Sequence, residues 1–309
     1  MSHAISEATA RALVGEGTAA LAAAGIATAR QDAEWLLASV LSVERFELFV
    51  EPAREVPSPA AVRYRAWVDR RTAHEPLQYI LGFEDFHGLR LTVTPDVLIP
   101  RPETEGLVEW AIEILKDRPG AEVADLGAGS GAIACAVAAG LPEVEVLAIE
   151  RSLGALAVAF ANVRRLGLAD RVHLLAGDLF EPLGAVRAGL DLVVANPPYL
   201  PTAILGSLPP EVSMYEPRLA LDGGPDGMAV IRRIIAGAPV VLRPGGWLLM
   251  EIGEEQAGPL ASLMAAEGFS GMGARRDLRG VERYIGGRWS PADGGAAGEA
   301  PLQRPGRTC

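Results

Sequence analysis

From about residue 120 onward, short apolar segments alternate with stretches of helical periodicity, and this alternation restricts the possible folds more than any other feature of the sequence. The apolar segments predicted as strands are 122–126, 145–150, 172–176, 190–195 and 247–252. The predicted helices are 131–139, 153–166, 227–241 and 255–267. Such alternation predicts an α/β fold, with a mostly parallel sheet and helices on both faces. Open sheets of this kind bind ligands at the carboxyl ends of their strands, so the chemistry is expected there.

A glycine-rich turn follows the first predicted strand. Residues 125–131 read Asp-Leu-Gly-Ala-Gly-Ser-Gly, and alternate glycines let the backbone approach a ligand and adopt conformations that are closed to other residues. Glu150 ends the next strand, where a carboxylate can accept hydrogen bonds from both hydroxyls of a ribose. The turn and the carboxylate together predict a nucleoside site.

The spacing of this turn distinguishes between nucleoside cofactors. The dinucleotide fingerprint is G-x-G-x-x-G, but Ala132 stands where its last glycine belongs, so an NAD-dependent oxidoreductase fits poorly. The turn instead resembles the first motif of class I S-adenosylmethionine methyltransferases. The third strand ends in Gly177-Asp178-Leu179, which suits the motif whose acidic side chain faces the adenine amino group. The resemblance implies a Rossmann-like class I methyltransferase fold, with S-adenosyl-L-methionine as cofactor and S-adenosyl-L-homocysteine as product.

The fourth predicted strand runs directly into Asn196-Pro197-Pro198-Tyr199. Two prolines make a rigid, extended turn and donate no hydrogen bonds, so the carbonyls around them are free to accept. The Asn196 side-chain oxygen and a proline carbonyl could together accept both N–H bonds of one NH2 group. An amide nitrogen is a poor nucleophile, so aligning its lone pair with a sulfonium methyl group would supply most of the catalysis. The tetrapeptide therefore predicts methylation of an amide nitrogen, with Tyr199 as a wall against the planar amide.

Upstream of the sheet, residues 1–75 predict a small helical domain. Alanine-rich sequence from about residue 6 stops at Gly25, and residues 28–31 have capping-box spacing before a helical apolar stripe. Ser58-Pro59 begins a third helix. Residues 76–99 are expected to be a β connector, with one or two strands from Tyr79 onward and a turn at Gly88. The methyltransferase domain is expected over 100–289, opening on a helix after Pro100, and residues 290–309 are expected to be a disordered tail.

The net charge of −11 argues against naked nucleic acid as the main partner. A cluster of basic residues is interpreted as a solvated helix face: Arg63, Arg65, Arg70, Arg71 and His74. The chain has neither the roughly 18–20 uninterrupted apolar residues of a membrane span nor a secretory signal, so a cytoplasmic protein without membrane contact is expected. The four histidines are scattered and Cys135 has no partner at ligand spacing, so no metal site is expected.

Several longer stretches resemble the release-factor glutamine methyltransferases of the PrmC/HemK type. They are Ile-Pro-Arg-Pro-Glu-Thr-Glu at 99–105, Tyr-Ile-Leu-Gly at 79–82, Tyr-Glu-Pro-Arg-Leu-Ala-Leu at 215–221 with Gly223-Gly224, Glu-Ile-Gly at 251–253, and Gly25-Ile26 with Asp-Ala-Glu at 32–34. The resemblance covers roughly residues 10–288. The chain departs from the pattern at Glu150, where Asp is more usual, and in the Gly/Ala/Pro-rich extension after Arg288.

This resemblance implies a protein-(glutamine-N5) methyltransferase that acts on the Gly-Gly-Gln motif of class I peptide chain release factors. The N-terminal domain would help to grip the release factor, and the Gly-Gly-Gln loop would enter between the domains. The implied cofactor-binding residues are Gly127, Ala128, Gly129, Ser130, Gly131, Glu150, Asp178, Leu179 and Asn196. The implied substrate-binding residues are Arg101, Glu103, Asn196, Pro197, Pro198 and Tyr199, and those expected to be catalytic are Asn196, Pro197 and Tyr199. Pro102 and Glu103 could equally well start a helix.

The tetrapeptide leaves the substrate open, because enzymes that methylate protein glutamine share it with enzymes that methylate adenine in DNA. A ribosomal-protein glutamine methyltransferase would have the same fold, cofactor and tetrapeptide, and only the resemblance at 99–105 argues against it. A DNA adenine methyltransferase would need a basic recognition domain to grip phosphates and extrude a base, and none is evident. A non-catalytic binding protein would not need the complete cofactor and Asn-Pro-Pro-Tyr motifs.

Overall fold

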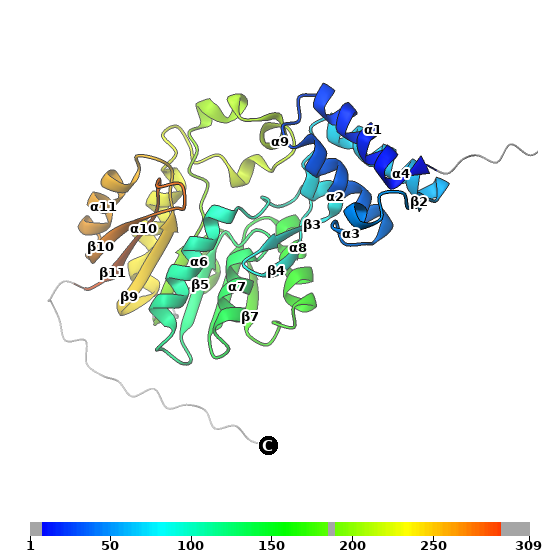
Figure 1. The fold of residues 1–309 in the computed structure, drawn as a ribbon. Helices are drawn as coiled ribbons and strands as arrows, with labels where there is room; N and C mark the ends of the chain where they lie inside the picture. The colour runs from blue at the N-terminus through cyan, green and yellow to red at the C-terminus, as the bar shows by residue number, and fades with distance from the viewer. Residues whose placement is uncertain (1–7, 185–188, 292–309) are drawn as a thin grey trace, which may run out of the picture.

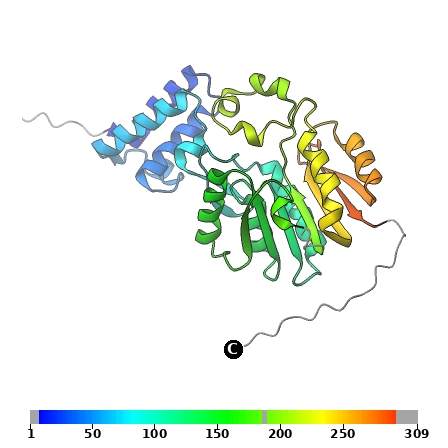
Figure 2. The same cartoon turned by 180° about the vertical axis from the view of Figure 1, so that it is seen from behind.

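A computed structural model describes residues 8–184 and 189–291 of the chain. A helical domain formed by the first part of the chain lies against one side of an α/β domain (Figure 1). The same arrangement seen from behind shows the segment after β8 bordering both domains (Figure 2). The predicted tail lies almost entirely outside the described residues; of it only Ser290 and Pro291 are described, and the Ser290 N–H donates to the Gly268 carbonyl at 3.1 Å.

Three longer helices of the N-terminal domain pack around a core of their own. They are α1 (Ala10–Ala23), α2 (Ala29–Leu41) and α4 (Ser58–Thr72), joined by the short α3 (Glu47–Val50) and by a small sheet of β1 (Ala8–Thr9) and β2 (Glu55–Val56). The buried Tyr64 hydroxyl donates to the Leu13 carbonyl at 3.1 Å, which joins α4 to α1. A Cβ at Gly17 would lie 2.0 Å from that hydroxyl oxygen, so glycine permits this close approach.

Two local predictions for the first hundred residues are wrong. Thr28 precedes α2, but its side chain makes no capping hydrogen bond, and its backbone does not have the extended geometry of a capping residue. The stretch from Tyr79 is not a strand, because residues 77–81 form helix α5 (Leu77–Leu81), which ends at Gly82 in the left-handed region. An apolar run of this length fits a buried helical turn as well as a strand.

A β hairpin follows α5 and carries the turn expected at Gly88. Its strands are β3 (Phe83–Phe86) and β4 (Leu89–Thr92). His87 and Gly88 both have positive φ, 47° and 74°, as a two-residue hairpin turn requires. Asn162 ties this hairpin to the α/β domain, because its side chain accepts from the Thr92 N–H at 2.7 Å and donates to the Thr92 carbonyl at 3.0 Å.

The α/β domain contains a seven-stranded sheet in the order β10-β11-β9-β8-β5-β6-β7. Its parallel strands are β5 (Glu122–Leu126), β6 (Glu145–Glu150), β7 (Val172–Ala176), β8 (Leu190–Ala195) and β9 (Leu242–Glu251). The strands β10 (Phe269–Arg276) and β11 (Glu282–Trp289) run antiparallel to their neighbours. The prediction of a mostly parallel sheet is confirmed, although β9 begins before residue 247 and the β10–β11 hairpin was not predicted.

Helices cover both faces of this sheet, and a separate core lies under each layer. One face carries α6 (Pro102–Leu115), α7 (Ala132–Gly140) and α8 (Leu153–Arg165). The other carries α10 (Ala229–Val241) and α11 (Ala257–Ala266). Short 3-10 turns, η1 (Glu181–Leu183), η2 (Thr202–Ser207) and η3 (Arg218–Ala220), and helix α9 (Pro210–Ser213) complete the domain. No helix of the described part of the chain combines the length and apolar character that crossing a membrane requires.

Residues 200–228, which follow the Asn-Pro-Pro-Tyr tetrapeptide and are here called the bridging segment, connect the two domains. The Tyr215 hydroxyl donates to the Ala73 carbonyl of the N-terminal domain at 2.7 Å. The buried Arg71 guanidinium donates to Asp32 at 2.8 Å within its own domain and to Glu211 of the bridging segment at 3.1 Å. These contacts place the N-terminal domain beside the carboxyl ends of the parallel strands (Figures 1 and 2).

Candidate functional site

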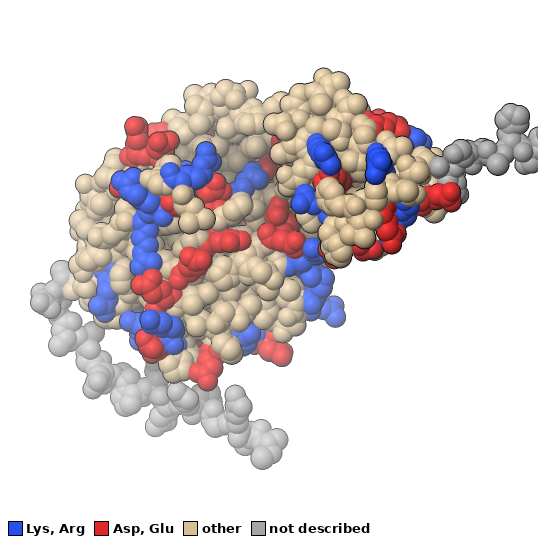
Figure 3. All heavy atoms as spheres, in the orientation of Figure 1, with Lys and Arg blue, Asp and Glu red and all other residues tan. Residues whose placement is uncertain are grey.

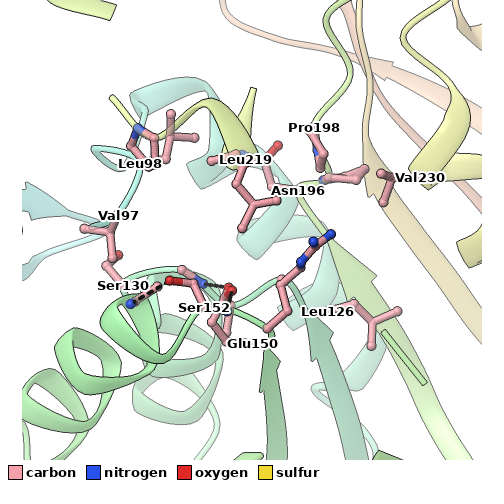
Figure 4. Close-up of a pocket in the computed structure, with 18 of the residues that line it drawn as sticks. Val97, Leu98, Leu126, Ser130, Glu150, Ser152, Asn196, Pro198, Leu219 and Val230 are labelled. Carbon is pink, nitrogen blue, oxygen red and sulfur yellow. Dashed lines mark hydrogen bonds between the residues drawn. The ribbon is translucent and has the colours of Figure 1, made fainter. Parts of the chain in front are cut away.

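A pocket opens at the carboxyl ends of the parallel strands, where the sequence predicts it. Its floor is the glycine-rich turn with the ends of β5, β6 and β8, and its upper wall includes Leu219 of the bridging segment. In Figure 4, Glu150 and Ser152 lie on one wall, Asn196 and Pro198 lie across from them, and Leu219 projects into the space between. The pocket is therefore lined both by strand ends and by the bridging segment.

The glycine-rich turn adopts a backbone conformation that side chains would strain. Gly127, Gly129 and Gly131 have φ of 73°, 56° and 80°. No atom lies within 4 Å of a Cβ built at Gly127, so glycine is needed there for its backbone conformation and not for space. The N–H groups of Gly127 and Ala128 donate to the Ile149 carbonyl at 2.8 and 3.0 Å, which holds the turn against the end of β6.

Glu150 is buried and its carboxylate is held by two backbone donors. One oxygen accepts from the Gly129 N–H at 2.9 Å and the other from the Ser152 N–H at 2.7 Å, the latter drawn in Figure 4. An ionised carboxylate offers about four lone-pair sites, so acceptor capacity remains on both oxygens. This set of acceptors suits a vicinal diol, and the residues of the pocket fit the nucleoside of S-adenosylmethionine.

At the end of β7, Asp178 and Leu179 line the same pocket. Asp178 forms an ion pair with Arg233 of α10 at 2.8 Å. Arg233 also lines the pocket and was not predicted as a site residue. Leu179 has a φ of 53°, which is uncommon for a residue other than glycine. Arg233 stands on a helix without a motif, so no pattern in the sequence indicates it.

The tetrapeptide forms the opposite wall with Asn196, Pro197 and Pro198. Three of the expected site residues lie outside the pocket wall, namely Gly131, Tyr199 and Glu103. Tyr199 packs against the core beneath α10 and α11, and its hydroxyl donates to Glu251 at 3.2 Å. Burial raises the pKa of Tyr199, so the hydroxyl keeps its proton and acts as a donor.

Arg101 and Glu103 begin helix α6 and face different parts of the molecule. Arg101 lines the pocket and donates through one nitrogen to both oxygens of Glu216, at 2.7 and 2.6 Å. Burial raises the pKa of Glu216, and the Arg101 guanidinium opposes that shift. Glu103 lies 3.7 Å from Arg279 of the β10–β11 hairpin, and its carbonyl accepts from the Tyr284 hydroxyl. Arg101 thus anchors the bridging segment at the pocket, and Glu103 joins α6 to the hairpin.

A buried hydrogen-bonded chain extends behind the tetrapeptide. The Asn196 side-chain NH2 donates to the Thr104 hydroxyl at 3.1 Å, and this hydroxyl donates to Glu251 at 2.7 Å. Thr104 lies at the wall of the pocket, but it and Glu251 are only 4% and 2% exposed, so both are held mainly by partners within the protein. Burial raises the pKa of Glu251, while hydrogen bonds from Thr104 and Tyr199 oppose the shift. Both residues fall inside motifs that carry the resemblance, but the sequence does not indicate that they meet.

The Tyr-Ile-Leu-Gly motif contributes indirectly to the pocket. Tyr79 is buried in helix α5, and its hydroxyl donates to the Val97 carbonyl at 2.6 Å. Val97 and Leu98 line the pocket opposite the tetrapeptide and were not predicted as site residues (Figure 4). The motif therefore fixes the segment that closes this side of the cleft.

Two family models match separate parts of the chain. The PrmC N-terminal domain matches residues 12–82, and the methyltransferase small domain matches residues 109–203. A release factor glutamine methyltransferase of Geobacter sulfurreducens is 46% identical over 269 residues, which are 87% of this chain and 92% of that protein. One of Moorella thermoacetica is 46% identical over 278 residues, which are 90% and 95% of the two chains.

The chain belongs to the release factor glutamine methyltransferases. The resemblance seen in the sequence is thereby confirmed, as are the class I methyltransferase fold and dependence on S-adenosylmethionine. Among solved structures, the catalytic domain of hMettl16 in complex with MAT2A 3′UTR hairpin 1 has a TM-score of 0.57 at 18% identity, covering 86% of this chain and 95% of that one. This second likeness shows the methyltransferase fold alone.

Proposed function

We propose that this methyltransferase transfers the methyl group of S-adenosylmethionine to the side-chain amide nitrogen of the glutamine in the Gly-Gly-Gln motif of class I release factors. The observation that carries the proposal is the alignment of nearly the whole chain with release factor glutamine methyltransferases, together with a wall of Asn196, Pro197 and Pro198 in the same pocket as the Glu150 carboxylate. Release factors act on cytoplasmic ribosomes, so the cytoplasm is the proposed site of action.

Some pocket residues would bind the cofactor and others the substrate. Glu150 would accept from the ribose hydroxyls, and Asp178 and Leu179 would flank the adenine. The bound cofactor supplies a methyl group on a positively charged sulfur. Asn196 Oδ1 and a proline carbonyl would accept the two amide hydrogens of the glutamine, which fixes the nitrogen in line with that methyl group. Transfer would form the N–C bond as the S–C bond breaks, so that neutral S-adenosylhomocysteine leaves, and the proton lost by the substrate nitrogen would pass to solvent.

Acceptors rather than a strong base suit this reaction. The amide lone pair is delocalised into its carbonyl, and two acceptors that polarise the N–H bonds raise the electron density on nitrogen. The only carboxylate among the described residues that is joined to Asn196 through one hydroxyl is Glu251, which is too deeply buried to touch the substrate. Alignment and electrostatics would therefore supply most of the rate enhancement.

The N-terminal domain would help to hold the release factor, and residues 1–75 are proposed as its substrate-recognition domain. The bridging segment supports this proposal, because Tyr215 and Glu211 contact the N-terminal domain while Leu219 and Pro217 line the pocket. A peptide loop that enters the pocket would thus pass a segment that is fastened to both domains. We propose residues 76–99 as the connector, which begins with α5 and continues as the β3–β4 hairpin, residues 100–289 as the methyltransferase domain, and residues 290–309 as the tail.

A nucleic-acid substrate is disfavoured by the charges on the N-terminal domain. Three of the five basic residues in the cluster are paired with carboxylates of their own domain: Arg65 with Glu16 at 2.7 Å, Arg70 with Glu75 at 2.5 Å, and Arg71 with Asp32 at 2.8 Å. His74 lies 3.3 Å from Glu211, and Arg63 donates to the Val40 carbonyl. On the face drawn in Figure 3, acidic and basic side chains are interspersed over this domain. A groove for phosphates would require unpaired cations.

The decisive experiment measures transfer of labelled methyl groups to purified release factor. A variant release factor with its Gly-Gly-Gln glutamine replaced is the matched control, and mass spectrometry identifies the modified residue. Label on the wild-type factor alone is the expected result. Label on neither factor, with cofactor binding demonstrated separately, would reject the proposal, and ribosomal proteins and then adenine-containing DNA would be assayed under the same conditions.

A further inference from the structure

The buried chain behind the tetrapeptide has a defined direction. A hydroxyl has a single hydrogen, and an ionised carboxylate can only accept. Thr104 gives its hydrogen to Glu251 at 2.7 Å, so it can only accept from Asn196 at 3.1 Å. The group that Asn196 presents to Thr104 must therefore be its NH2, which turns its carbonyl oxygen away from the buried chain.

Tyr199 completes the arrangement at the other end. Its hydroxyl donates to the second oxygen of Glu251 at 3.2 Å, so each carboxylate oxygen accepts from one hydroxyl. Two donors to a single carboxylate favour its charged form. With Glu251 ionised, every hydrogen bond of the chain runs in one direction, from Asn196 and Tyr199 toward the carboxylate.

We propose that Thr104 and Glu251 are positioning residues, and that the ionised carboxylate, acting through the Thr104 hydroxyl, holds the Asn196 amide with its oxygen facing the substrate. The inference rests on the proposed function, in which Asn196 Oδ1 accepts from the glutamine NH2. An asparagine amide is nearly symmetric in shape, so packing alone distinguishes poorly between its two orientations. The direction of the hydrogen bonds supplies the missing distinction.

Protonation of Glu251 would remove this control. A neutral carboxyl group can donate to Thr104, and the Thr104 hydrogen is then free to donate to the Asn196 oxygen. The asparagine amide would be reversed with all of its buried partners still satisfied, and an NH2 group would face the NH2 of the substrate. Two donors opposite each other leave a buried polar group unpaired, which corresponds to a loss of about 10- to 100-fold in turnover.

The groups around Glu251 act on its protonation in opposite senses. Burial raises its pKa, and the nearby Glu103 of α6 adds to that effect. Thr104, Tyr199 and the charge of Arg283 on β11 act in the other direction. Tyr284, opposite Glu251 in the sheet, remains protonated because burial raises its own pKa. Activity requires the ionised form, so it is present above the pKa of Glu251 and falls as the pH drops through it.

The chain offers an unusually direct readout, because its only two asparagines are Asn162 and Asn196. Protein labelled with 15N in asparagine side chains gives two NH2 signals, and Asn162, buried in a separate network, is an internal reference. The Asn196 signals of the wild type are expected to shift with pH as Glu251 titrates. In Glu251→Gln, which cannot titrate, this shift is expected to disappear while the Asn162 signals behave as before.

Turnover provides the second measurement, with Thr104→Val, Thr104→Ser and Thr18→Val compared in the full chain. Thr18 lies on α1, where its hydroxyl donates to a backbone carbonyl at 2.7 Å, and it serves as the matched control. Thr104→Val is expected to lower kcat on release factor by about 10- to 100-fold with KM and cofactor affinity nearly unchanged. Thr104→Ser should restore most of the turnover, and Thr18→Val should match the wild type.

Different results would contradict the positioning role of Thr104 and Glu251 and the proposed function. Thr104→Ser as slow as Thr104→Val would show that the hydroxyl is not the required group, and an Asn196 signal that shifts identically in wild type and Glu251→Gln would show that the carboxylate does not control the amide. Either result overturns the inference. A wild-type enzyme that labels no release factor overturns the proposed function instead, while the NMR titration still tests the hydrogen-bond direction.

Discussion

The Glu150 carboxylate and the Gly129 backbone N–H are joined by a hydrogen bond of 2.9 Å at the floor of the cofactor pocket. This bond connects the end of β6 to the middle of the glycine-rich turn, so the acceptor and the turn are held in one geometry. The Ser152 N–H fixes the other carboxylate oxygen at 2.7 Å. Because the carboxylate is oriented before any ligand arrives, little conformational entropy should be lost when a ribose binds.

Glu150→Ala should weaken binding of S-adenosylmethionine by at least about 10- to 100-fold, because the loss of even one hydrogen bond to a charged acceptor costs about 1.5–3 kcal/mol. Isothermal titration calorimetry measures the change. Glu145→Ala is the matched control, since Glu145 begins the same strand at the opposite end of the sheet and pairs with His173 there. Equal affinity in the two variants would contradict the ribose assignment.

Asn162 connects the β3–β4 hairpin to the glycine-rich turn, so its loss should destabilise the protein. Its side-chain NH2 donates to the carbonyls of Thr92 and Ser130 at 3.0 and 2.9 Å, and the residue is fully buried. Asn162→Asp keeps the shape but places an acceptor against two carbonyls, which should lower the unfolding free energy by about 2–4 kcal/mol. Urea unfolding measures this loss. Asp170→Asn, on an exposed loop, should change stability by less than about 0.5 kcal/mol.

The central strands could be predicted because the sheet is covered on both faces. β5 and β8 are buried along nearly their whole length, so they appear in the sequence as short, mainly apolar segments, each interrupted by one aspartate, Asp125 and Asp191. The β10–β11 hairpin gives no such signal. Most of β10 is exposed, and glycines at 271, 273, 286 and 287 interrupt any alternation. These strands form because β9 offers a free edge, which is a property of the folded sheet.

Much of the candidate site could also be predicted, because residues that directly follow parallel strands meet at one edge of the sheet. Glu150, Asp178 and Asn196 each stand at a strand end and line one pocket. The contact between Thr104 and Glu251 could not be predicted, because 147 residues separate them and they meet only when α6 packs on β9. Tyr199 differs from its expected place. Its motif predicts a wall of the pocket, whereas its hydroxyl donates to the buried Glu251 carboxylate.

The Arg101–Glu216 pair should hold the bridging segment on the pocket. Glu216 has a side chain only 2% exposed, so removal of its cation leaves a buried charge uncompensated. Arg101→Met should therefore destabilise the protein by about 3–5 kcal/mol, and Arg101→Met with Glu216→Gln by clearly less. A double-mutant cycle on the unfolding free energy tests this coupling. Losses that simply add would show that the two side chains act independently.

Asn196→Ala separates binding of the cofactor from turnover. The variant removes an acceptor for the substrate amide and leaves Glu150 with both of its backbone donors. Turnover on release factor should fall by about 100-fold or more, because an acceptor required only for alignment in the transition state is lost, while cofactor affinity stays within about 3-fold. Single-turnover kinetics and calorimetry measure the two quantities. Full turnover in this variant would remove Asn196 from the reaction.

Asp125 makes stability depend on pH. It is fully buried at the start of the glycine-rich turn, one oxygen accepts from the Ala134 N–H at 3.0 Å, and the other has no partner among the described residues. Burial raises the pKa of Asp125 to about 7 from 3.8, the value expected in the unfolded chain. The folded protein thus keeps this proton over a range in which the unfolded chain has lost it. The stabilisation is fully present below the unfolded pKa and is lost as the pH rises through about 7.

Asp125→Asn stays neutral at every pH and should abolish this dependence. The unfolding free energy of the variant minus that of the wild type should therefore increase between about pH 5 and pH 7, by at most about 1.4 kcal/mol per pH unit, and level off above that range. Urea unfolding of both proteins across these pH values measures the difference. Asp170→Asn, whose carboxylate is exposed, should give a difference that stays flat. A flat difference for Asp125→Asn as well would mean that Asp125 is ionised in the folded protein throughout the range, with its second oxygen stabilised by a partner such as bound water.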